Sequence, residues 1–169
     1  MDEHVRRSLK TVRNFKELVQ LEKNVRHRRA YDEVTAAAFK ERGESIARGL
    51  IAERTGLDLG ELTPAEEKIV RAVSEYLAIK HREGSNANRT LDQLRNRGLI
   101  EAAETAVSKS KPTQGFETLH REHLDDLSYE QIVINHPEEF SPRALWFSRR
   151  TLGLANASEK APARPSIPA

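Results

Sequence analysis

The chain has 169 residues and no cysteine, which excludes disulfides, thiolate nucleophiles and zinc sites built on cysteine. Charged residues make up 32% of it, yet the net charge is only +2, because acidic and basic side chains are interleaved as on solvated helix faces. Aromatic residues reach only 5%, which argues against a large β-sandwich or barrel. No apolar run approaches the roughly 20 residues that span a bilayer. The first residues, Met-Asp-Glu-His-Val, do not begin a signal peptide, so we expect a soluble cytoplasmic protein.

Residues 3–55 predict two long amphipathic helices. Gly43 and Gly49 weaken the second, which starts near Ala30, and could mark a bend. Thr55-Gly56 ends it. Together the two helices would form an antiparallel hairpin or a dimerisation arm over residues 1–58. In the first, apolar residues recur at steps of three and four and form one stripe: Val5, Leu9, Val12, Phe15, Leu18, Val19, Leu21 and Val25.

A second domain is expected over residues 59–153, and Thr63-Pro64-Ala65-Glu66 marks its first helix. Thr63 can cap free amides, Pro64 suits the first helical position, and Glu66 can complete a capping box. This helix should end by Glu83-Gly84.

Residues 90–97 predict a short helix with Leu91 and Leu94 inward, closed by Gly98 in a left-handed conformation. Residues 101–107 allow two interpretations: their alanines favour a helix, while their position favours a strand of a hairpin that returns over residues 116–119. Residues 109–115 form the connecting turn or loop.

Two further short helices are expected at 129–135 and 143–152, and the second should bury Leu145, Trp146 and Leu152. Residues 154–169, rich in Ala, Pro and Ser, predict a disordered tail. The expected fold class is mostly α: a long N-terminal helical pair, then a compact helical domain for which a winged helix is one option.

The order of a helix, a short helix and a basic turn resembles the winged helix-turn-helix DNA-binding proteins over roughly residues 63–119. The resemblance implies that the helix of residues 86–97 enters the major groove while the following loop holds the phosphate backbone. It departs from the pattern between Glu83 and Asn88, where there is little room for the usual middle helix. The matching positions are Arg89, Thr90, Leu94, Gly98, Leu99 and Ile100. The implied DNA-binding residues are Asn86, Asn88, Arg89, Gln93, Arg95, Arg97, Lys109 and Lys111.

A second candidate is the pair of segments 128–135 and 141–152, which looks like the helix-turn-helix of sigma factors. The resemblance implies DNA contacts from Arg143, Ser148, Arg149 and Arg150. Acidic side chains on the same stretch would repel phosphates, so a packing subdomain is the preferred interpretation. These are Asp125, Asp126, Glu130, Glu138 and Glu139.

Two smaller clusters have plain alternatives. His120 and His123, joined by His136, could bind zinc or iron. The zincin motif is missing, however, and no metal or cofactor is expected. The basic run at residues 26–29 could touch phosphates, but a solvated corner at a helix C-terminus is the preferred interpretation.

The favoured function is double-stranded DNA binding by a small regulator or DNA-processing accessory factor, with a homodimer formed through the N-terminal helices. One alternative is a helical adaptor that binds protein through its N-terminal stripe. Another, less favoured, is a metal-dependent enzyme that uses His120, His123 and nearby carboxylates.

Overall fold

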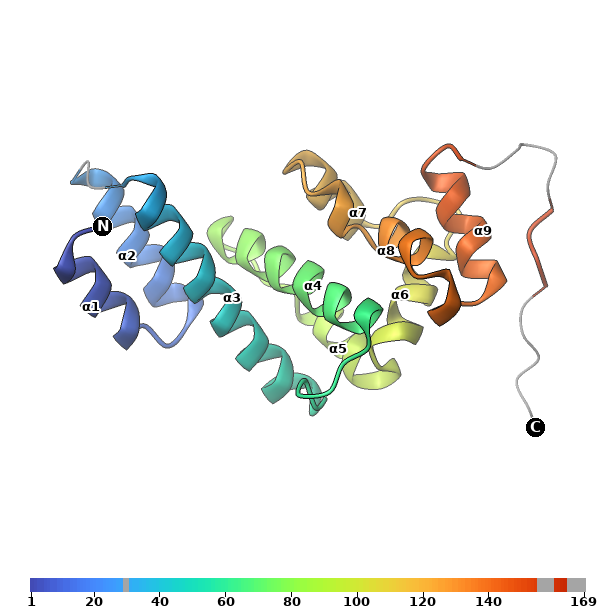
Figure 1. Ribbon diagram of the computed structural model, residues 1–169, viewed down its shortest axis with the longest axis horizontal. Helices are drawn as coiled ribbons and strands as arrows, with labels where there is room; N and C mark the ends of the chain where they lie inside the picture. Colours follow the sequence, from blue (N-terminus) through green and yellow to red (C-terminus); the bar gives the residue numbers. More distant parts are fainter. Residues whose placement is uncertain (29–30, 155–159, 164–169) are drawn as a thin grey trace. The chain divides into compact units, whose positions relative to one another are not determined.

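The computed structural model describes residues 1–28, 31–154 and 160–163, and within these ranges it contains helices and connecting segments but no strand (Figure 1). The predicted mostly α fold class is therefore confirmed. None of the described helices combines the length and the apolar character needed to cross a membrane. The helices are α1 Glu3–Thr11, α2 Phe15–His27, α3 Glu33–Thr55, α4 Pro64–Arg82, α5 Asn88–Arg97, α6 Leu99–Val107, α7 Gln114–Arg121, η1 Asp125–Leu127, α8 Tyr129–Asn135, η2 Pro137–Glu139 and α9 Pro142–Thr151.

The chain divides into two compact units. The first consists of Met1–Leu59 and Val73–Asp92, and the second of Gly60–Ala72 and Gln93–Ala169. The first unit therefore includes residues 73–92 in addition to the N-terminal segment that the sequence analysis ended at residue 58. Two helices, α4 and α5, each contribute one part to each unit.

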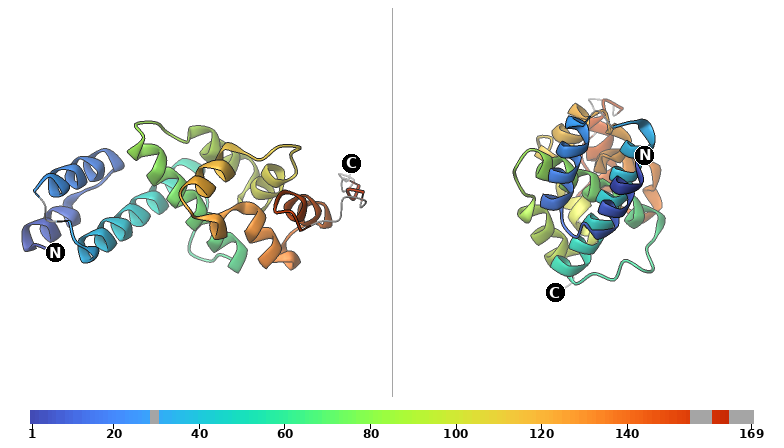
Figure 2. Two further views of the ribbon diagram at one scale, coloured as in Figure 1. Left: turned by 90° about the horizontal axis from the view of Figure 1, so that it is seen from above. Right: turned by 90° about the vertical axis from the view of Figure 1, so that its left-hand side faces the viewer.

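In the first unit α1, α2 and α3 pack against one another (Figures 1 and 2). The prediction of one long first helix is wrong, because the helix ends at Thr11 and a new one begins at Phe15. Asn14 and Glu17 explain the break: Asn14 Oδ1 accepts from the Glu17 N–H at 3.0 Å, and Glu17 Oε2 accepts from the Arg13 N–H at 2.8 Å. This is a capping box that starts a new helix.

The apolar stripe of the first two helices forms the core of this unit. Its members that are at most 6% exposed are Val5, Leu9, Val12, Phe15, Leu18 and Val25. Arg42 of α3 donates from Nε to the Val12 carbonyl at 3.0 Å, so the carbonyl at the end of α1 is also satisfied from within the unit. The surface expected to bind a partner or a second copy is thus used internally.

Helix α3 runs without interruption through Gly43 and Gly49, so neither glycine ends it. Gly43 is buried beneath α2: a Cβ there would lie 3.5 Å from Leu18 Cδ2. The helix ends as predicted, with Gly56 in the left-handed conformation at φ 72° and ψ 10°.

The predicted start of α4 is confirmed. The Thr63 N–H donates to Glu66 Oε2 at 2.9 Å, and the Glu66 N–H donates to Thr63 Oγ1 at 3.3 Å, which completes the capping box. Glu139, which belongs to the same unit as residues 60–72, adds to this cap: its Oε1 accepts a hydrogen bond from the Ala65 N–H at 3.0 Å.

The second unit is built on α6, α8 and α9, which pack against one another. Of the two interpretations of residues 101–107 the helix is correct and the hairpin is not, since α6 covers residues 101–107 and α7 covers residues 116–119. Ala102 and Ala103 favour a helix and are buried in it. A second cap, from Thr113 Oγ1 to the Phe116 N–H at 3.2 Å, starts α7 where the strand was expected.

Two details of this unit differ from expectation. Gly98 has φ 78° and ψ 179°, which is an extended glycine conformation between α5 and α6 rather than the left-handed cap. Helix α9 buries Ala144 and Ser148, while Leu145, Trp146 and Leu152 are half-buried. The predicted disordered tail falls mostly on residues 155–159 and 164–169, which lie outside the described residues.

Candidate nucleic-acid interface

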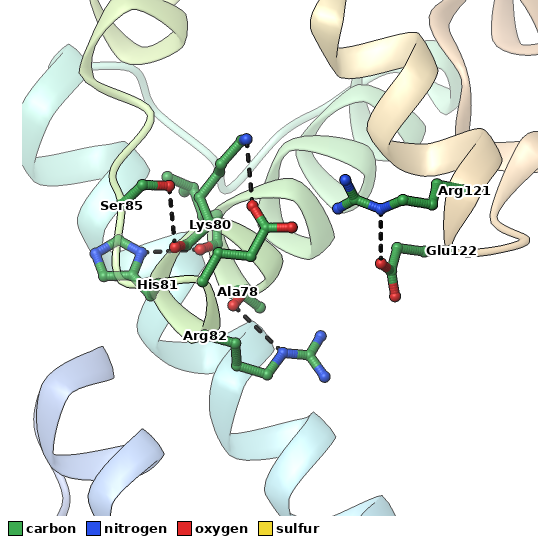
Figure 3. Close-up of polar contacts among 9 residues, drawn as sticks. Ala78, Lys80, His81, Arg82, Ser85, Arg121 and Glu122 are labelled. Carbon is green, nitrogen blue, oxygen red and sulfur yellow. Dashed lines mark hydrogen bonds and ion pairs between the residues drawn. The ribbon is translucent and has the colours of Figure 1, made fainter.

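The turn that leads into α5 is a Schellman motif, in which backbone N–H groups cap the last carbonyls of α4. The Ser85 N–H donates to the Lys80 carbonyl at 2.9 Å, and the Gly84 N–H donates to the His81 carbonyl at 3.1 Å. Gly84 supplies the positive φ of 75° that the motif requires. Ser85 Oγ adds a second bond to the Lys80 carbonyl at 3.2 Å (Figure 3).

Side chains fix the same end of α4 within the first unit. His81 Nδ1–H donates to the Leu77 carbonyl at 2.8 Å (Figure 3). The His81 ring stacks on Phe15 of α2 with centroids 4.4 Å apart. Lys80 Nζ lies 3.3 Å from Glu83 Oε2. Since residues 73–92 form part of one compact unit, this turn holds the first half of α5 on a defined support.

Helix α5 presents a polar face. Leu91 and Leu94 are at most 2% exposed and define its buried side. Arg89 and Arg95 are exposed and form no ion pair within the part of the chain that the structure describes; Arg95 borders the buried side, because it follows Leu91 by four residues. Asp92 lies three residues from each arginine, and i,i+3 side chains are neighbours on a helix. Six residues turn Arg95 about 120° from Arg89 around the helix axis, and the carboxylate of Asp92 lies between them.

The other predicted residues of this segment lie differently. Arg97 is turned about 200° from Arg95 around the helix axis, and its Nη1 is paired with Glu101 Oε1 at 3.0 Å. Gln93 is half-buried. Asn86 is exposed in the turn, where its Oδ1 accepts from the N–H of the exposed Asn88 at 3.4 Å.

Lys109 and Lys111 are exposed in the segment between α6 and α7. That segment joins two helices, so these lysines are not carried by a β-wing. They belong to the second unit together with Gln93, Arg95 and Arg97, whereas Asn86, Asn88 and Arg89 belong to the first.

The helices α8 and α9 pack together as a helix-turn-helix pair would. One of the four expected contacts is wrong, because Ser148 is fully buried and cannot reach a nucleic acid. Arg143 and Arg150 are engaged with aromatic rings, Arg143 over Phe147 at 4.9 Å and Arg150 over Trp146 at 5.6 Å. Arg149 is exposed.

The histidines of the proposed metal site are not brought together. His120 Nδ1 contacts Asp125 Oδ1, a hydrogen bond that lowers the pKa of that carboxyl. His136 instead lies with Glu138 and Glu139, its Nδ1 3.9 Å from Glu138 Oε1. Glu139 already caps α4, through Thr63 Oγ1 and the Ala65 N–H, so its oxygens hold protein groups.

The basic run that begins at Arg26 ends α2, as the solvated-corner interpretation requires; Arg29 lies outside the described residues. Arg26 Nη2 lies 2.8 Å from Glu22 Oε1, and its guanidinium stacks 3.7 Å over the Tyr31 ring. Burial by itself would raise the pKa of Glu22, but hydrogen bonds from Tyr31 and Arg26 outweigh it and lower the pKa. Arg26 is thus held by intramolecular contacts.

Sequence reasoning missed the Schellman turns. The sequence His-Arg-Glu occurs twice, at 81–83 and 120–122, each time directly before a residue with positive φ, Gly84 and His123. The Leu124 N–H donates to the Leu119 carbonyl at 2.8 Å, so the end of α7 repeats the motif. Beside it, Arg121 Nε lies 3.3 Å from Glu122 Oε1 (Figure 3). The repeated tripeptide was the available signal.

Comparisons with protein-family models, with curated proteins and with solved structures find no match for this chain.

Proposed function

We propose that the chain binds double-stranded DNA through the exposed face of α5, with Arg89 and Arg95 as the principal contacts. The supporting observation is that both arginines are exposed on one short helix and that neither forms an ion pair within the described ranges. Arginine suits this role because its planar guanidinium pairs with phosphates and with guanine edges.

The turn before α5 supports the same proposal. A helix that enters a groove needs a fixed support, and the capped end of α4, held by the Schellman bonds and by the His81–Phe15 stack, supplies one. Asn88 begins α5 and is exposed, so its side-chain amide is available to a phosphate or a base edge. Lys109 and Lys111 would add sequence-independent phosphate contacts.

Arg97 and Gln93 are left out of the proposed contacts. Arg97 is paired with Glu101 and Gln93 is half-buried, so both would have to be released first. The apolar stripe of α1 and α2 is buried within the protein, so a homodimer would need an interface on another surface.

The test is a titration of the full chain with a mixed-sequence duplex at several salt concentrations. The double variant Arg89→Ala/Arg95→Ala should reduce the slope of log affinity against log salt by about 2. The matched control is Arg6→Ala/Arg7→Ala, which removes the same charge from two exposed arginines of α1 that pair with Glu3. An equal loss in both variants would mean that net charge, not this face, governs binding.

The alternative function, a helical adaptor, required an exposed apolar stripe on the N-terminal helices, and that stripe is buried. Val5, Leu9 and Phe15 are at most 6% exposed, so the N-terminal stripe is not available to a partner protein. No observation favours it over the α5 face.

A further inference from the structure

The C-terminal stretch of the described chain makes one long-range contact with α9. Arg143 Nη1 donates to the carbonyl of Pro162 at 2.8 Å. Pro162 is half-buried, whereas Lys160, Ala161 and Ala163 around it are exposed. The contact is therefore specific to one residue of an otherwise solvated segment.

Arg143, which holds the Pro162 carbonyl, neighbours aromatic side chains of α9. Trp146 and Phe147 of α9 pack edge to face with ring centroids 4.9 Å apart, and Arg143 lies over the Phe147 ring. The indole Nε1–H of Trp146 is covered, and within the described part of the chain it has no acceptor. Because this donor is covered, Trp146 can offer a docking peptide its ring but not its N–H.

Proline-containing peptides are recognised by surfaces of this composition. Such a peptide adopts the extended polyproline II helix, which leaves its carbonyls free for donors and lays its rings against aromatic side chains. The sequence after α9 has prolines at 162, 165 and 168, a spacing of three that matches the three residues per turn of this helix.

We propose that Arg143, Trp146 and Phe147 form a docking surface for an extended proline-containing peptide, and that its occupant is the chain's own segment around Pro162. The intervening segment is short, so the local concentration of the occupant is of millimolar order. A peptide from another molecule therefore has to displace the segment around Pro162 before it can bind. This inference is independent of DNA binding by α5.

The first experiment compares the backbone amide resonances of Ala161 and Ala163 in the full-length protein with those in two variants. Arg143→Gln removes the donor, and Arg149→Gln is the matched control on the same helix. Docking predicts that only Arg143→Gln moves both resonances to random-coil positions. Random-coil positions in the unmodified protein, or equal effects of both variants, would overturn the proposal.

The second experiment uses the fact that Trp146 is the chain's single tryptophan, so its emission reports on this surface alone. The probe is a synthetic peptide with the sequence of residues 158–169. It should bind the full-length Pro162→Gly variant about tenfold more tightly than the unmodified chain, whose own segment competes. It should not bind the double variant Arg143→Gln/Pro162→Gly. No binding to Pro162→Gly, or equal binding of a peptide with alanine at every proline, would refute the proposal.

Discussion

Glu139 Oε1 accepts a hydrogen bond from the backbone N–H of Ala65 at 3.0 Å, and the same carboxylate contacts Thr63 Oγ1. These groups are separated by more than seventy residues of sequence. Through them the segment after α8 caps the first turn of α4, where free N–H groups would otherwise lack partners. The cap ties Gly60–Ala72 to the rest of the second unit.

Glu139→Ala should therefore destabilise the protein by about 1 kcal/mol, the usual size of a lost helix cap. Denaturant unfolding followed by circular dichroism measures this. Glu138→Ala is the control, since Glu138 is exposed and its carboxylate lies 3.9 Å from His136 Nδ1 rather than at the start of α4. Equal destabilisation by the two changes would show that the cap contributes nothing.

His123 takes the position of a glycine. It is the only non-glycine residue with positive φ in the described ranges, at 58°, and it ends α7 in a Schellman motif. The left-handed conformation costs an L-residue about 1–2 kcal/mol. His123→Gly should stabilise the fold by up to about 1 kcal/mol, because the greater freedom of glycine in the unfolded chain offsets part of the gain.

The reverse change belongs to the same experiment. Gly84 has φ 75° at the equivalent position after α4, and Gly84→Ala should lower the free energy of unfolding by about 1 kcal/mol. Both effects are measured by thermal melting. Opposite signs from those predicted would contradict the assignment of the two turns to one motif.

Glu130 of α8 is 3% exposed, and burial raises the pKa of its carboxyl. The folded state then holds this proton more tightly than the unfolded chain does. Stability is consequently greatest below the unfolded pKa of about 4.3 and falls as pH rises through the raised folded pKa. Glu130→Gln should stabilise the protein at pH 7, with a difference that shrinks towards zero below about pH 4. The free energy of unfolding of both proteins, measured across this pH range, tests the prediction. A variant that is less stable than the parent at pH 7 would contradict it.

Much of the fold could be predicted from local chemistry. Helix ends depend on contacts over three or four residues, so the sequence alone indicates them. Thr63 with Glu66 starts α4, Ser141 with Pro142 starts α9, and Gly56 ends α3. Residues 101–107 stayed open between two interpretations because their alanines favour a helix while their position suits a strand, and α6 is found as a helix packed against α8 and α9.

The candidate site was predicted only in part, for the same physical reason. The exposure of Arg89 and Arg95 follows from helical periodicity with Leu91 and Leu94 inward. The pairing of Arg97 with Glu101 could not be read in advance, because it depends on the single-residue connection at Gly98. Ser148 was misplaced because a small hydroxyl residue on a short helix carries no signal of burial.

Removing the charge of Asp92 should raise duplex affinity, whereas removing an arginine should lower it. The Asp92 carboxylate stands between Arg89 and Arg95 on the proposed DNA-binding face and repels phosphates. Asp92→Asn should raise duplex affinity by about 1.5- to 5-fold, which corresponds to the roughly 0.2–1 kcal/mol of an exposed charge interaction. Asp58→Asn, a distant change of equal charge, is the control in the same titration, and equal gains would point to net charge alone.

The most direct test of DNA binding by α5 is the salt dependence of duplex affinity for the full chain and for Arg89→Ala/Arg95→Ala. The α5 assignment predicts a slope smaller by about 2 and an affinity at least about tenfold lower in the variant, while Arg6→Ala/Arg7→Ala behaves as the parent. A parent protein whose duplex affinity is no greater than that of a charge-matched control protein, or a variant with unchanged slope, would contradict it.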